Sequence, residues 1–596
     1  MCGIFGIVVE QEQPLGEILT EAGRRLSYRG YDSVGCATLQ DDGAIDLRKD
    51  VGKVDEVAAR LRFAEMVGRR GIVQLRWATF GVPSQVNSQP HLDSDGDLVG
   101  AHNGNVVNNV ELRQQFIAEG MTVRSFNDGE SCVHAVERYV DQGYGMVEAI
   151  RRAYDDLEGD YAFVIGRVGE EALYAIKKGS GLVVGLGEGF TCCSSDLPSV
   201  LPLTRRILRV RDGEIVTLWA GRAELRRVSD GSLVEREVEK VTESMAVVEK
   251  GGYPHFMLKE IHEQPQVAGD LLHLLAAFSH VSPMVETMRR ARHLYFVGCG
   301  TSYHACLMGA VYAARLAGRP AIPILAPQFI AQYGPALTPD DVAVFVSQSG
   351  ETKDVLNALE VAQARGVTPL GLVNVVGSTL MNESKHYLPL ACGYEISVPA
   401  TKTFVNQVIA FLYLALRMGE QPVGVLDCLP DLMRQTLEEV EPQVERVLPA
   451  FDGRDDLYQL GYGLTYGIAL EGALKLKEIT YAHCEGILST EFKHGPLSAV
   501  GAGYPVIFVV GPEDVSLLVS AINEVTCRGG RAVVVAEEDA RLRANAHDLI
   551  VLPPSGPLLM PILATLPLQL LSYRMSVARG YDPDFPRNLS KTLTVD

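Results

Sequence analysis

The sequence predicts an α+β domain followed by two α/β domains with parallel sheets. The first 240 or so residues are rich in short β-type runs such as GIFGIVV and GLVVGLG, separated by Gly, Asp and Asn, which is typical of a layered α+β domain. Beyond about residue 285, apolar strands alternate with longer helical patterns, as in parallel sheets with crossover helices. That second region also contains an internal repeat.

The chain length and one charged segment predict the domain boundaries. At 596 residues the chain is too long for a single core. A charged stretch with a GGYP breaker, from about 237 to 262, indicates a linker that leads into a helix. The predicted divisions are a first domain at 2–240, a linker with its helix at 241–284, two similar domains at 285–425 and 450–581, and a C-terminal tail at 582–596.

Composition excludes several classes of protein. A formal net charge of −20 disfavours a general nucleic-acid or anionic-membrane binder and favours a small partner. Eleven cysteines without CxxC pairs favour free thiols in a reducing cytoplasm over a disulfide framework or a zinc cluster. We expect a cytoplasmic protein with no metal and no cofactor. The apolar stretch 558–571 is too short to span a bilayer and is predicted as a core helix. The opening MCGIFGIV leaves no room for a secretory signal before the first strand.

The internal repeat holds one offset of 163 residues. A strand, a Gly-rich turn and a helix are read at VGCGTSY and again at LGYGLTY, so two similar α/β domains are expected. Three pairs of landmarks carry the offset: Gly298 with Gly461, Phe345 with Phe508, and Arg365 with Arg528.

The two copies differ in the loop after their second aligned strand. The first copy has SQSGET at 347–352, whose hydroxyls, amide and backbone N–H groups at a helix start suit an anion. The second has VGPEDV at 510–515, where two carboxylates would repel a phosphate. With Thr301 and Ser302 on the adjacent turn, one phosphate site is expected, in the first copy; alternatively, SQSGET only caps a helix. GCGTSY lacks the third glycine of a dinucleotide fingerprint, because Tyr303 stands there, which disfavours a nicotinamide enzyme.

Cys2 is a candidate nucleophile. If the initiator methionine is removed, Cys2 carries a thiol and a free α-amine, so that it can act as its own general base. Asn103 and Gly104, in the run HNG, offer an amide and a backbone N–H for an oxyanion. Arg76 and Asp128 suit the carboxylate and ammonium of an amino-acid substrate. The alternatives are a small buried cysteine in the first strand and two surface charges.

These motifs, taken in order, resemble a known family. MCGIFGIV, SYRGYDSVG, RWATFGVPSQVN, HNG and FNDGES are similar to the class II (N-terminal nucleophile) glutamine amidotransferase domain. VGCGTS, SQSGET, ATKTF, ALEGALKLKE, EFKHGPL and PRNLSKTLTVD resemble the isomerase half of the glutamine–fructose-6-phosphate aminotransferase family. The resemblance spans the chain from Cys2 to Asp596. It implies an αββα N-terminal nucleophile hydrolase-type domain followed by two sugar isomerase (SIS-type) domains.

For the first domain, the resemblance implies a glutaminase. Cys2 would attack the glutamine side-chain amide, with Asn103 and Gly104 as the oxyanion hole. Ammonia would then pass through an internal channel, with Trp77 similar to the family's gating tryptophan; alternatively, Trp77 is plain core. The residues that would hold the amino-acid end of glutamine are Arg76, Thr79 and Asp128.

For the second region, the resemblance implies sugar chemistry on a charged helix face. Glu471, Lys475 and Glu478 lie at i, i+4 and i+7 on one helical face, which is otherwise read as a solvated salt-bridge stripe. By resemblance Glu478 is the base that moves a proton between C1 and C2, with Lys475 close to it. His494 would open the sugar ring from the neighbouring subunit, which implies a homodimer. The alternative for His494 is a hydrogen-bonded turn histidine.

The C-terminal tail would complete the sugar site. By resemblance Lys591 is the Schiff-base lysine, which requires the tail to fold over the site, whereas a terminal lysine is ordinarily solvated. Phosphate would be held by Ser302, Ser347, Gln348, Ser349 and Thr352, and the sugar would be lined by Cys299, Gly300, Thr301 and the backbone near Val398.

Several positions depart from the family pattern. Gln74, Phe80 and Gln89 stand where the family commonly has histidines around the glutamine site. In the run Val398-Pro399-Ala400, Ala400 replaces a usual serine. These departures bear on glutamine affinity, loop closure and contacts to the sugar hydroxyls more than on the reaction class.

The expected function is the glutamine-dependent conversion of fructose 6-phosphate to glucosamine 6-phosphate and glutamate. The alternatives are a paralogue acting on a different sugar phosphate, a sugar-phosphate isomerase or deaminase, a sugar-phosphate sensor with an impaired glutaminase, and a glutaminase serving another synthetic domain. Retention of Glu478, His494 and Lys591 argues against the sensor, because a sensor needs no proton-transfer groups.

Overall fold

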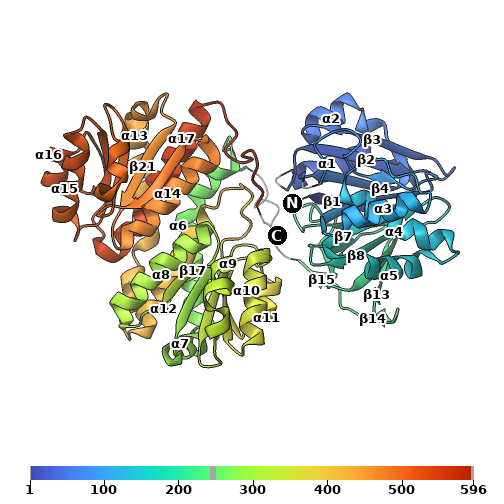
Figure 1. Cartoon of the computed structure of the whole chain (residues 1–596), viewed down its shortest axis with the longest axis horizontal. Coiled ribbons are helices and arrows are strands. Elements are labelled where there is room, and N and C mark those ends of the chain that lie inside the picture. The colour runs from blue at the N-terminus through green and yellow to red at the C-terminus, as the bar shows by residue number, and fades with distance from the viewer. Residues whose placement is uncertain (1, 28, 79, 242–249, 592–596) are drawn as a thin grey trace. The chain divides into compact units, whose positions relative to one another are not determined.

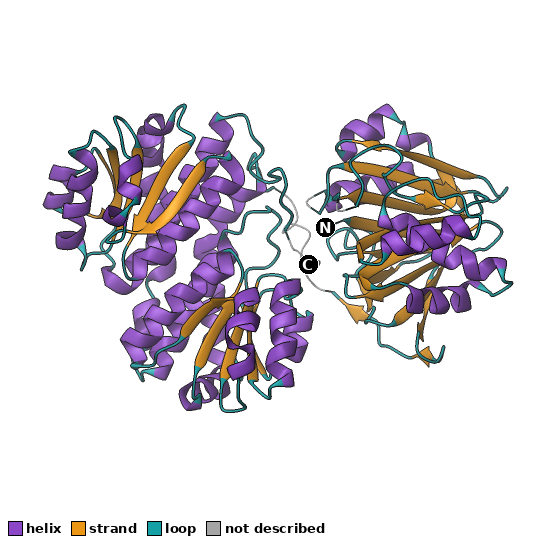
Figure 2. Cartoon of the chain, in the orientation of Figure 1, coloured by secondary structure: helices purple, strands orange, loops and turns teal. Residues whose placement is uncertain are grey.

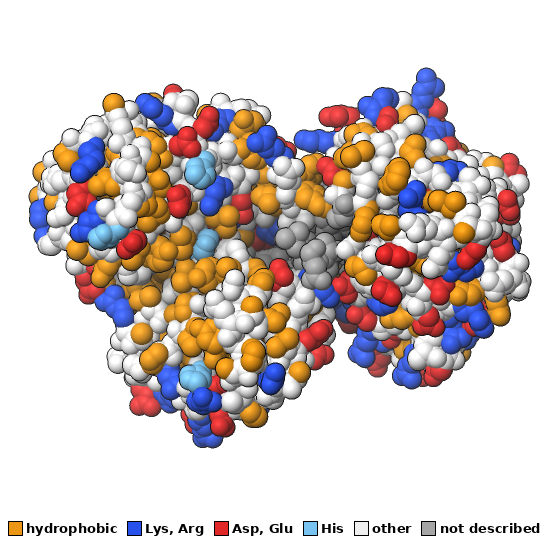
Figure 3. Space-filling model, in the orientation of Figure 1, with side chains coloured by type: hydrophobic (Ala, Val, Ile, Leu, Met, Phe, Trp, Pro, Cys, Tyr) orange, Lys and Arg blue, Asp and Glu red, His pale blue; other side chains and the backbone are white. Residues whose placement is uncertain are grey.

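The computed structural model describes residues 2–27, 29–78, 80–241 and 250–591. By internal contacts these residues form two compact units, one at 2–241 and the other at 250–591. Figures 1 and 2 show two sheets in each unit, and acidic and basic side chains are interspersed over the face seen in Figure 3. The prediction for Thr79 falls on a position outside the described residues.

The first unit contains two antiparallel sheets. The eight-stranded sheet has the order β15 (Glu239–Lys240), β11 (Arg206–Arg209), β9 (Val183–Leu186), β10 (Phe190–Ser194), β1 (Gly3–Pro14), β4 (Val67–Arg76), β2 (Ser33–Leu39) and β3 (Ile45–Val51). The seven-stranded sheet has the order β14 (Leu233–Val234), β13 (Arg222–Arg227), β12 (Glu214–Trp219), β8 (Leu173–Lys178), β7 (Gly159–Arg167), β6 (Leu98–Val106) and β5 (His91–Leu92).

Helices cover the outer face of each sheet in this unit. They are α1 (Gly16–Leu26) and α2 (Val54–Arg60) on the first sheet, and α3 (Asn109–Ala118), α4 (Asp128–Asp141) and α5 (Met146–Asp156) on the second. Side chains of β1 explain the layering: Ile4 and Val8 pack between the two sheets, while Phe5, Ile7 and Val9 pack against α1 and α2. A strand buried on both faces reads as a continuous apolar run, as GIFGIVV does. The predicted αββα domain is confirmed.

The second unit contains two five-stranded parallel sheets. One has the order β17 (Ile322–Leu325), β16 (Leu294–Gly298), β18 (Val342–Ser347), β19 (Thr368–Val373) and β20 (His386–Pro389). The other has the order β22 (His483–Leu488), β21 (Asp456–Gly461), β23 (Pro505–Val510), β24 (Arg531–Glu537) and β25 (Asp548–Leu552). In chain order both read 2-1-3-4-5, so each sheet has a switch point between its first and third strands.

Helices lie on both faces of these sheets (Figure 2). Two of them, α6 (Phe256–Ala277) and α7 (Val281–Arg290), precede the first sheet. The others are α8 (Thr301–Ala317), α9 (Ala326–Gln328), α10 (Lys353–Ala364), α11 (Thr379–Glu383), α12 (Lys402–Met418), α13 (Leu429–Val447), α14 (Leu464–Thr480), α15 (Val515–Thr526), α16 (Ala540–Asn545) and α17 (Gly556–Ala578).

The internal repeat is confirmed down to the backbone. Helices α8 and α14 begin at the predicted offset, and the glycines before them have matching conformations. Gly300 has φ 51° and ψ −124°, and Gly463 has φ 55° and ψ −121°. Only glycine adopts this region without strain, so the turn requires glycine in both copies. The two α/β domains predicted from the repeat are therefore present.

The apolar stretch near the C-terminus lies in α17, which is longer than the sequence pattern indicated. By length and composition this helix could cross a membrane, but 83% of its most apolar window is buried inside the protein. Its side chains belong to the core of the second unit, together with those of α13 and α14. The prediction of a core helix is confirmed, and the stretch 558–571 underestimated its length.

The residues after α17 are tied to the start of α6. The Asp584 carboxylate accepts hydrogen bonds from the backbone N–H groups of Phe256 and Met257 at 2.8 and 2.7 Å. The Asp584 carbonyl accepts another from the N–H of Val398 at 2.9 Å. A carboxylate at a helix N-terminus satisfies N–H groups that have no partner within the helix. The tail thereby joins α6 to the segment that leads into α12.

Replacing Asp584 by alanine should loosen the start of α6. Loss of a side-chain cap costs roughly 0.5–2 kcal/mol, so exchange of the Phe256 and Met257 amide protons should accelerate about two- to thirtyfold. Hydrogen–deuterium exchange measures this. Asp270→Ala, which removes an exposed carboxylate from the same helix, is the control. Unchanged protection in Asp584→Ala would contradict the cap.

Candidate active sites

Cys2 lies directly before β1, beside the end of β4. The pairing of β1 with β4 places Gly3 opposite Leu75, so the residues after β4 come next to the nucleophile. The backbone N–H of Trp77 donates to the Cys2 Sγ at 3.3 Å. Burial raises the pKa of the Cys2 thiol, so a base must take its proton before it attacks a substrate.

The proposed oxyanion donors lie at the end of β6. Asn103 is buried, and neither atom of its side-chain amide has a hydrogen-bond partner among the described residues. A buried amide without a partner is costly, so this one is explained best by a ligand that completes its hydrogen bonds. Gly104 has φ 110°, and a Cβ there would lie 2.0 Å from the Asp160 carbonyl oxygen. The packing of β6 against β7 therefore requires this glycine in addition to any role in catalysis.

A buried cation and a buried anion flank the same region. Arg76 Nη2 donates to the carbonyls of Phe80 and, at 2.6 Å, Gly81, whereas Nε and Nη1 are unpaired among the described residues. Burial lowers the pKa of Arg76. Asp128 begins α4, and its Oδ2 accepts from the N–H of Val106 at 3.0 Å. The unpaired guanidinium atoms can receive a carboxylate, and Asp128 can receive an ammonium.

Trp77 is half-buried, and its ring meets Tyr31 edge-on with centroids 5.8 Å apart.

Of the residues that depart from the family pattern, Gln74 and Gln89 are fully buried and both contact His102. Phe80 is half-buried and contributes its backbone carbonyl to Arg76. Gln74 and Gln89, which stand where the family commonly has histidines, therefore both donate to the backbone carbonyl of His102, the first residue of the HNG run.

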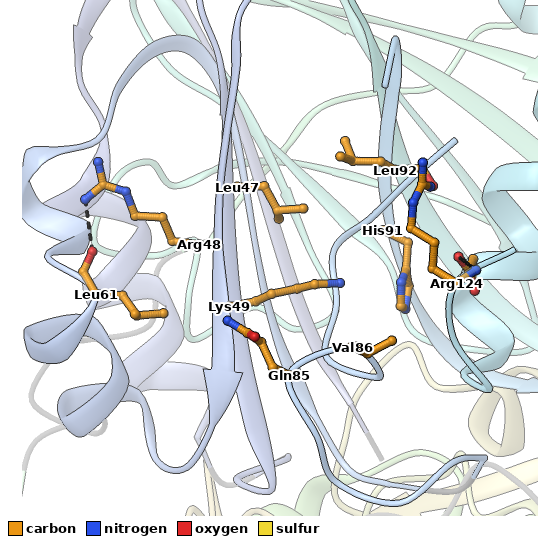
Figure 4. Close-up of a pocket in the computed structure, with 10 residues that line it drawn as sticks. Leu47, Arg48, Lys49, Leu61, Gln85, Val86, His91, Leu92 and Arg124 are labelled. Atoms are coloured by element: carbon orange, nitrogen blue, oxygen red, sulfur yellow. Dashed lines mark hydrogen bonds between the residues drawn. The ribbon is translucent and has the colours of Figure 1, made fainter. Parts of the chain in front are cut away.

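The first unit also contains a cavity of about 410 Å³ that sequence reasoning missed (Figure 4). Lys49, His91, Arg124 and Glu130 line it together with apolar side chains. Burial lowers the pKa of Lys49 to about 8, and its Nζ donates to two backbone carbonyls, at 2.6 and 2.9 Å. No motif signalled this cavity, because its lining comes from separated parts of the chain: β3, the residue after α2, the loop before β5, β5 itself, and the segment that leads into the first turn of α4.

In the second unit, the SQSGET loop lies at the switch point of the first sheet. Ser347 ends β18, and its hydroxyl is 3.0 Å from that of Thr352, the residue before α10. The Ser347 hydroxyl also accepts from the N–H of Gly350 at 3.0 Å. Ser302, in the first turn of α8, accepts from Gln407 Nε2 at 3.0 Å. The N-termini of α8 and α10 thus both follow strands at this switch point, which is where anions bind in such sheets.

The remaining members of the predicted sugar site surround this loop. Cys299 and Gly300 form the turn between β16 and α8. The Ser349 hydroxyl accepts from the N–H of Glu351 at 3.1 Å, within the loop itself. The Gln348 carbonyl accepts from two N–H groups that follow β19. Pro399 and Ala400 lie between Val398 and the start of α12.

The charged face of α14 is buried and meets the turn of the other copy. Lys475 Nζ lies 3.3 Å from Glu471 and 2.5 Å from Glu478. Glu471 accepts from the Thr301 hydroxyl at 3.0 Å and lies 2.8 Å from His304 Nδ1. Burial raises the pKa of Glu478, although the charge of Lys475 opposes this. A raised pKa suits a carboxylate that takes up a proton during the reaction. The solvated-stripe alternative is wrong, because Glu471 and Lys475 are each 1% exposed.

Lys591 is not a solvated terminal lysine. Its Nζ donates to Glu395 Oε2 at 2.6 Å and to the Ser397 carbonyl at 2.8 Å. Burial alone would raise the pKa of Glu395, but Lys591, the N–H of Thr401 and the hydroxyl of Thr403 lower it to about 2. Glu395 was missed by sequence reasoning. The only feature of the sequence that could have indicated it is its position shortly before the ATKTF motif.

A second buried carboxyl group lies beside this ion pair. Glu260, on α6, accepts through Oε1 from the N–H groups of Ile396 and Ser397, and its Oε2 has no partner among the described residues. Burial, followed by the charge of Glu395, raises the pKa of Glu260 to about 8. Lys402 Nζ pairs with Glu263 at 2.8 Å. The lysine of ATKTF therefore belongs to the same buried charge cluster.

His494 is not joined to the other proposed residues of the sugar site. It ends a short 3-10 helix, Phe492–His494, and is exposed. Among the described residues, no hydrogen bond or ion pair joins its ring to another side chain. The structure therefore brings Glu478 and Lys475 together but does not add His494 to them.

Comparisons with known proteins agree with the fold. A family model described as SIS domain matches residues 287–417 and 452–579, and one described as glutamine amidotransferase domain matches 75–184. Glutamine–fructose-6-phosphate aminotransferase (isomerizing) from Methanothermobacter thermautotrophicus is 41% identical over 605 residues, and that from Aquifex aeolicus is 38% identical over 604. Both comparisons cover 100% of each chain.

Solved structures match the second unit. The C-terminal domain of glucosamine-fructose-6-phosphate aminotransferase from Francisella tularensis has a TM-score of 0.52 at 30% identity, covering 57% of this chain and 100% of that chain. Tagatose-6-phosphate ketose/aldose isomerase from Escherichia coli has a TM-score of 0.51 at 20% identity, covering 56% and 95%, and shows the shared fold alone.

The fold and the two sites define a glutamine amidotransferase domain joined to a pair of SIS domains. The chain belongs to the glutamine–fructose-6-phosphate aminotransferase family. The resemblance and the fold class inferred from the motifs are both confirmed.

Glu260 should make the stability of the folded chain depend on pH. Its folded-state pKa of about 8 lies above its ordinary value of 4.5, so the folded chain holds more protons than the unfolded chain between these values. Stability therefore falls as the pH rises through that window. In Glu260→Gln, which keeps the acceptor for Ile396 and Ser397, the fall in Tm between pH 6 and pH 8.5 should shrink by about 2 °C or more.

Thermal unfolding of wild type and variant at both pH values measures this difference. Glu438→Gln, which neutralises an exposed acid on α13, should leave the pH dependence as in wild type. An unchanged pH dependence in Glu260→Gln would show that Glu260 is ionised in the folded chain throughout this range.

Proposed function

We propose that the protein converts fructose 6-phosphate and glutamine to glucosamine 6-phosphate and glutamate. The observation that carries the proposal is the presence, in a chain of this family, of two distinct buried sites with the chemistry that each half-reaction needs. One contains the Cys2 thiol together with a buried amide, at Asn103, and a buried guanidinium, at Arg76, that lack partners among the described residues. The other has a buried carboxylate–lysine helix face and a buried lysine on the tail.

In the glutaminase half, Cys2 attacks the side-chain amide of glutamine once its thiol has lost a proton. The Asn103 amide and the Gly104 N–H stabilise the negative charge that develops on the oxygen. Arg76 and Asp128 hold the carboxylate and ammonium of the amino acid, and Thr79 is assigned with them by the family pattern alone. The unpaired atoms of Asn103 and Arg76 support these roles, because glutamine would give each buried group its missing partner.

In the sugar half, the loop 347–352 and the start of α8 hold the phosphate, and Lys591 forms a Schiff base with the open-chain ketose. Glu478 removes a proton from C1 and returns it at C2, assisted by the nearby Lys475. Cys299, Gly300, Thr301 and the backbone at Val398 line the sugar. The raised pKa of Glu478 supports its role as the base.

Three further features belong to this proposal. Ammonia passes from the first site to the second through an internal channel gated by Trp77. The exposed His494 serves the sugar site of a neighbouring copy, so the active form is a homodimer. Eleven free cysteines support a reducing cytoplasm as its location.

The two sites should fail independently. Cys2→Ala should abolish glutamine-dependent synthesis of glucosamine 6-phosphate while sparing phosphosugar isomerisation, because only the nitrogen supply is lost. Lys591→Ala should do nearly the reverse and keep glutamine hydrolysis. A single assay with fructose 6-phosphate and glutamine, which follows glucosamine 6-phosphate, glutamate and glucose 6-phosphate, measures both.

Cys527→Ala removes an exposed thiol and should behave as wild type. Equal loss of both activities in each of the two site variants would contradict the two-site scheme. Formation of glutamate without any amino sugar by the wild type would instead favour a glutaminase with another purpose.

A further inference from the structure

Gln89 is a fully buried amide that contacts one histidine at three points. Its Oε1 accepts from the backbone N–H of His102 at 2.6 Å. Its Nε2 lies 3.2 Å from His102 Nδ1 and 3.1 Å from the His102 carbonyl oxygen. His102 directly precedes Asn103, so Gln89 contacts the segment that carries the proposed oxyanion donors.

These contacts determine the orientation of the amide. A backbone N–H can only donate, so the Gln89 atom that meets it must be the carbonyl oxygen. The amide NH₂ therefore faces the His102 ring. Because that NH₂ can only donate, Nδ1 of His102 must accept, and it carries no proton.

The orientation of Gln89 in turn determines what His102 offers to Asp128. With Nδ1 unprotonated, the ring proton of neutral His102 is on Nε2, which lies 3.2 Å from Asp128 Oδ2. His102 thus donates to the carboxylate. The other tautomer would present a lone pair to a buried carboxylate, and that arrangement would repel.

A second amide strengthens the arrangement. Gln74 Nε2 donates to the same His102 carbonyl at 3.3 Å, so both buried glutamines hold the residue before Asn103. Among the described residues, the ionisable groups that face the His102 ring are Asp128 on α4 and His91 on β5. An amide does not titrate, so neither glutamine changes its charge with pH.

We propose that Gln89 is a positioning residue for glutamine binding. By fixing the proton of His102 on Nε2, it keeps Asp128 oriented so that the other carboxylate oxygen, Oδ1, can receive the substrate ammonium. Asn127 Nδ2 is the described donor near Oδ1, at 3.3 Å. This proposal rests on the proposed glutaminase function of the first unit and assigns a role to a residue that departs from the family's histidine.

Gln89→Glu tests the proposal with almost no change in shape. The new carboxylate still accepts from the His102 N–H, but its second oxygen faces two acceptors, Nδ1 and the His102 carbonyl. The contact becomes favourable only if an extra proton binds, either to the introduced carboxylate or to His102 Nδ1. The variant should therefore bind glutamine adequately at low pH and poorly at high pH.

The measurement is glutamine hydrolysis by the full-length chain between pH 6 and pH 8.5. Relative to wild type, kcat/KM for glutamine in Gln89→Glu should fall about tenfold or more as the pH rises, with most of the change in KM. Gln85→Glu makes the same charge change at an exposed position of the same loop and should follow wild type. A pH profile of Gln89→Glu that parallels wild type overturns the proposal.

A measurement on the unaltered chain covers the case in which Gln89→Glu does not fold. Neutron diffraction from crystals of the wild type should show deuterium on Nε2 of His102 and none on Nδ1. Deuterium on Nδ1 overturns the proposal. If wild type hydrolyses no glutamine, the proposed function fails, whereas active wild type with Nδ1 protonated refutes the role of Gln89 alone.

Discussion

A polar group taken out of water must find a partner inside the protein, and both units depend on this constraint. In the second unit it is met at the Glu395 carboxylate, which accepts from Lys591, from two backbone N–H groups and from the Thr403 hydroxyl. That single buried charge holds the C-terminal tail to the segment before α12. In the first unit the Asn103 amide and two atoms of the Arg76 guanidinium are buried without partners among the described residues. Under the proposed function, glutamine supplies the partners that the Asn103 amide and the Arg76 guanidinium lack.

The two SIS domains have the same strand order but carry different polar side chains. Their strand order and their glycine turns agree closely. The first copy retains the hydroxyl-rich loop at its switch point, whereas the second has Glu513 and Asp514, and Glu513 pairs with Arg315. The second copy instead supplies α14, whose Glu471 and Lys475 reach Thr301 in the turn of the first copy. Neither copy therefore forms this cluster of polar side chains alone. Hydrogen bonds between α8 and α14 join its members.

Two of the departures from the family pattern contact His102, the first residue of the HNG run. Gln74 and Gln89 place two neutral amides against His102, where ionisable imidazoles are usual in the family. Histidine can change its charge near neutral pH, and an amide cannot. Gln74 and Gln89 are thus hydrogen-bonded parts of the interior. Their hydrogen bonds give the segment before Asn103 a fixed geometry without a titrating group.

The sequence by itself determined the fold class and identified most of the residues that we propose for the two sites. The alternation of apolar strands and helical patterns identified the parallel sheets, and a constant offset identified the repeat, because both patterns are local or linear in the chain. Helical spacing was enough to predict that Lys475 lies next to Glu471 and Glu478. Tertiary structure alone decided that Lys591 meets Glu395, 196 residues earlier in the chain, and that Gln89 orients His102. Pairing of buried charges and amides depends on which atoms the folded chain brings within about 3 Å, and no spacing along the sequence specifies that distance.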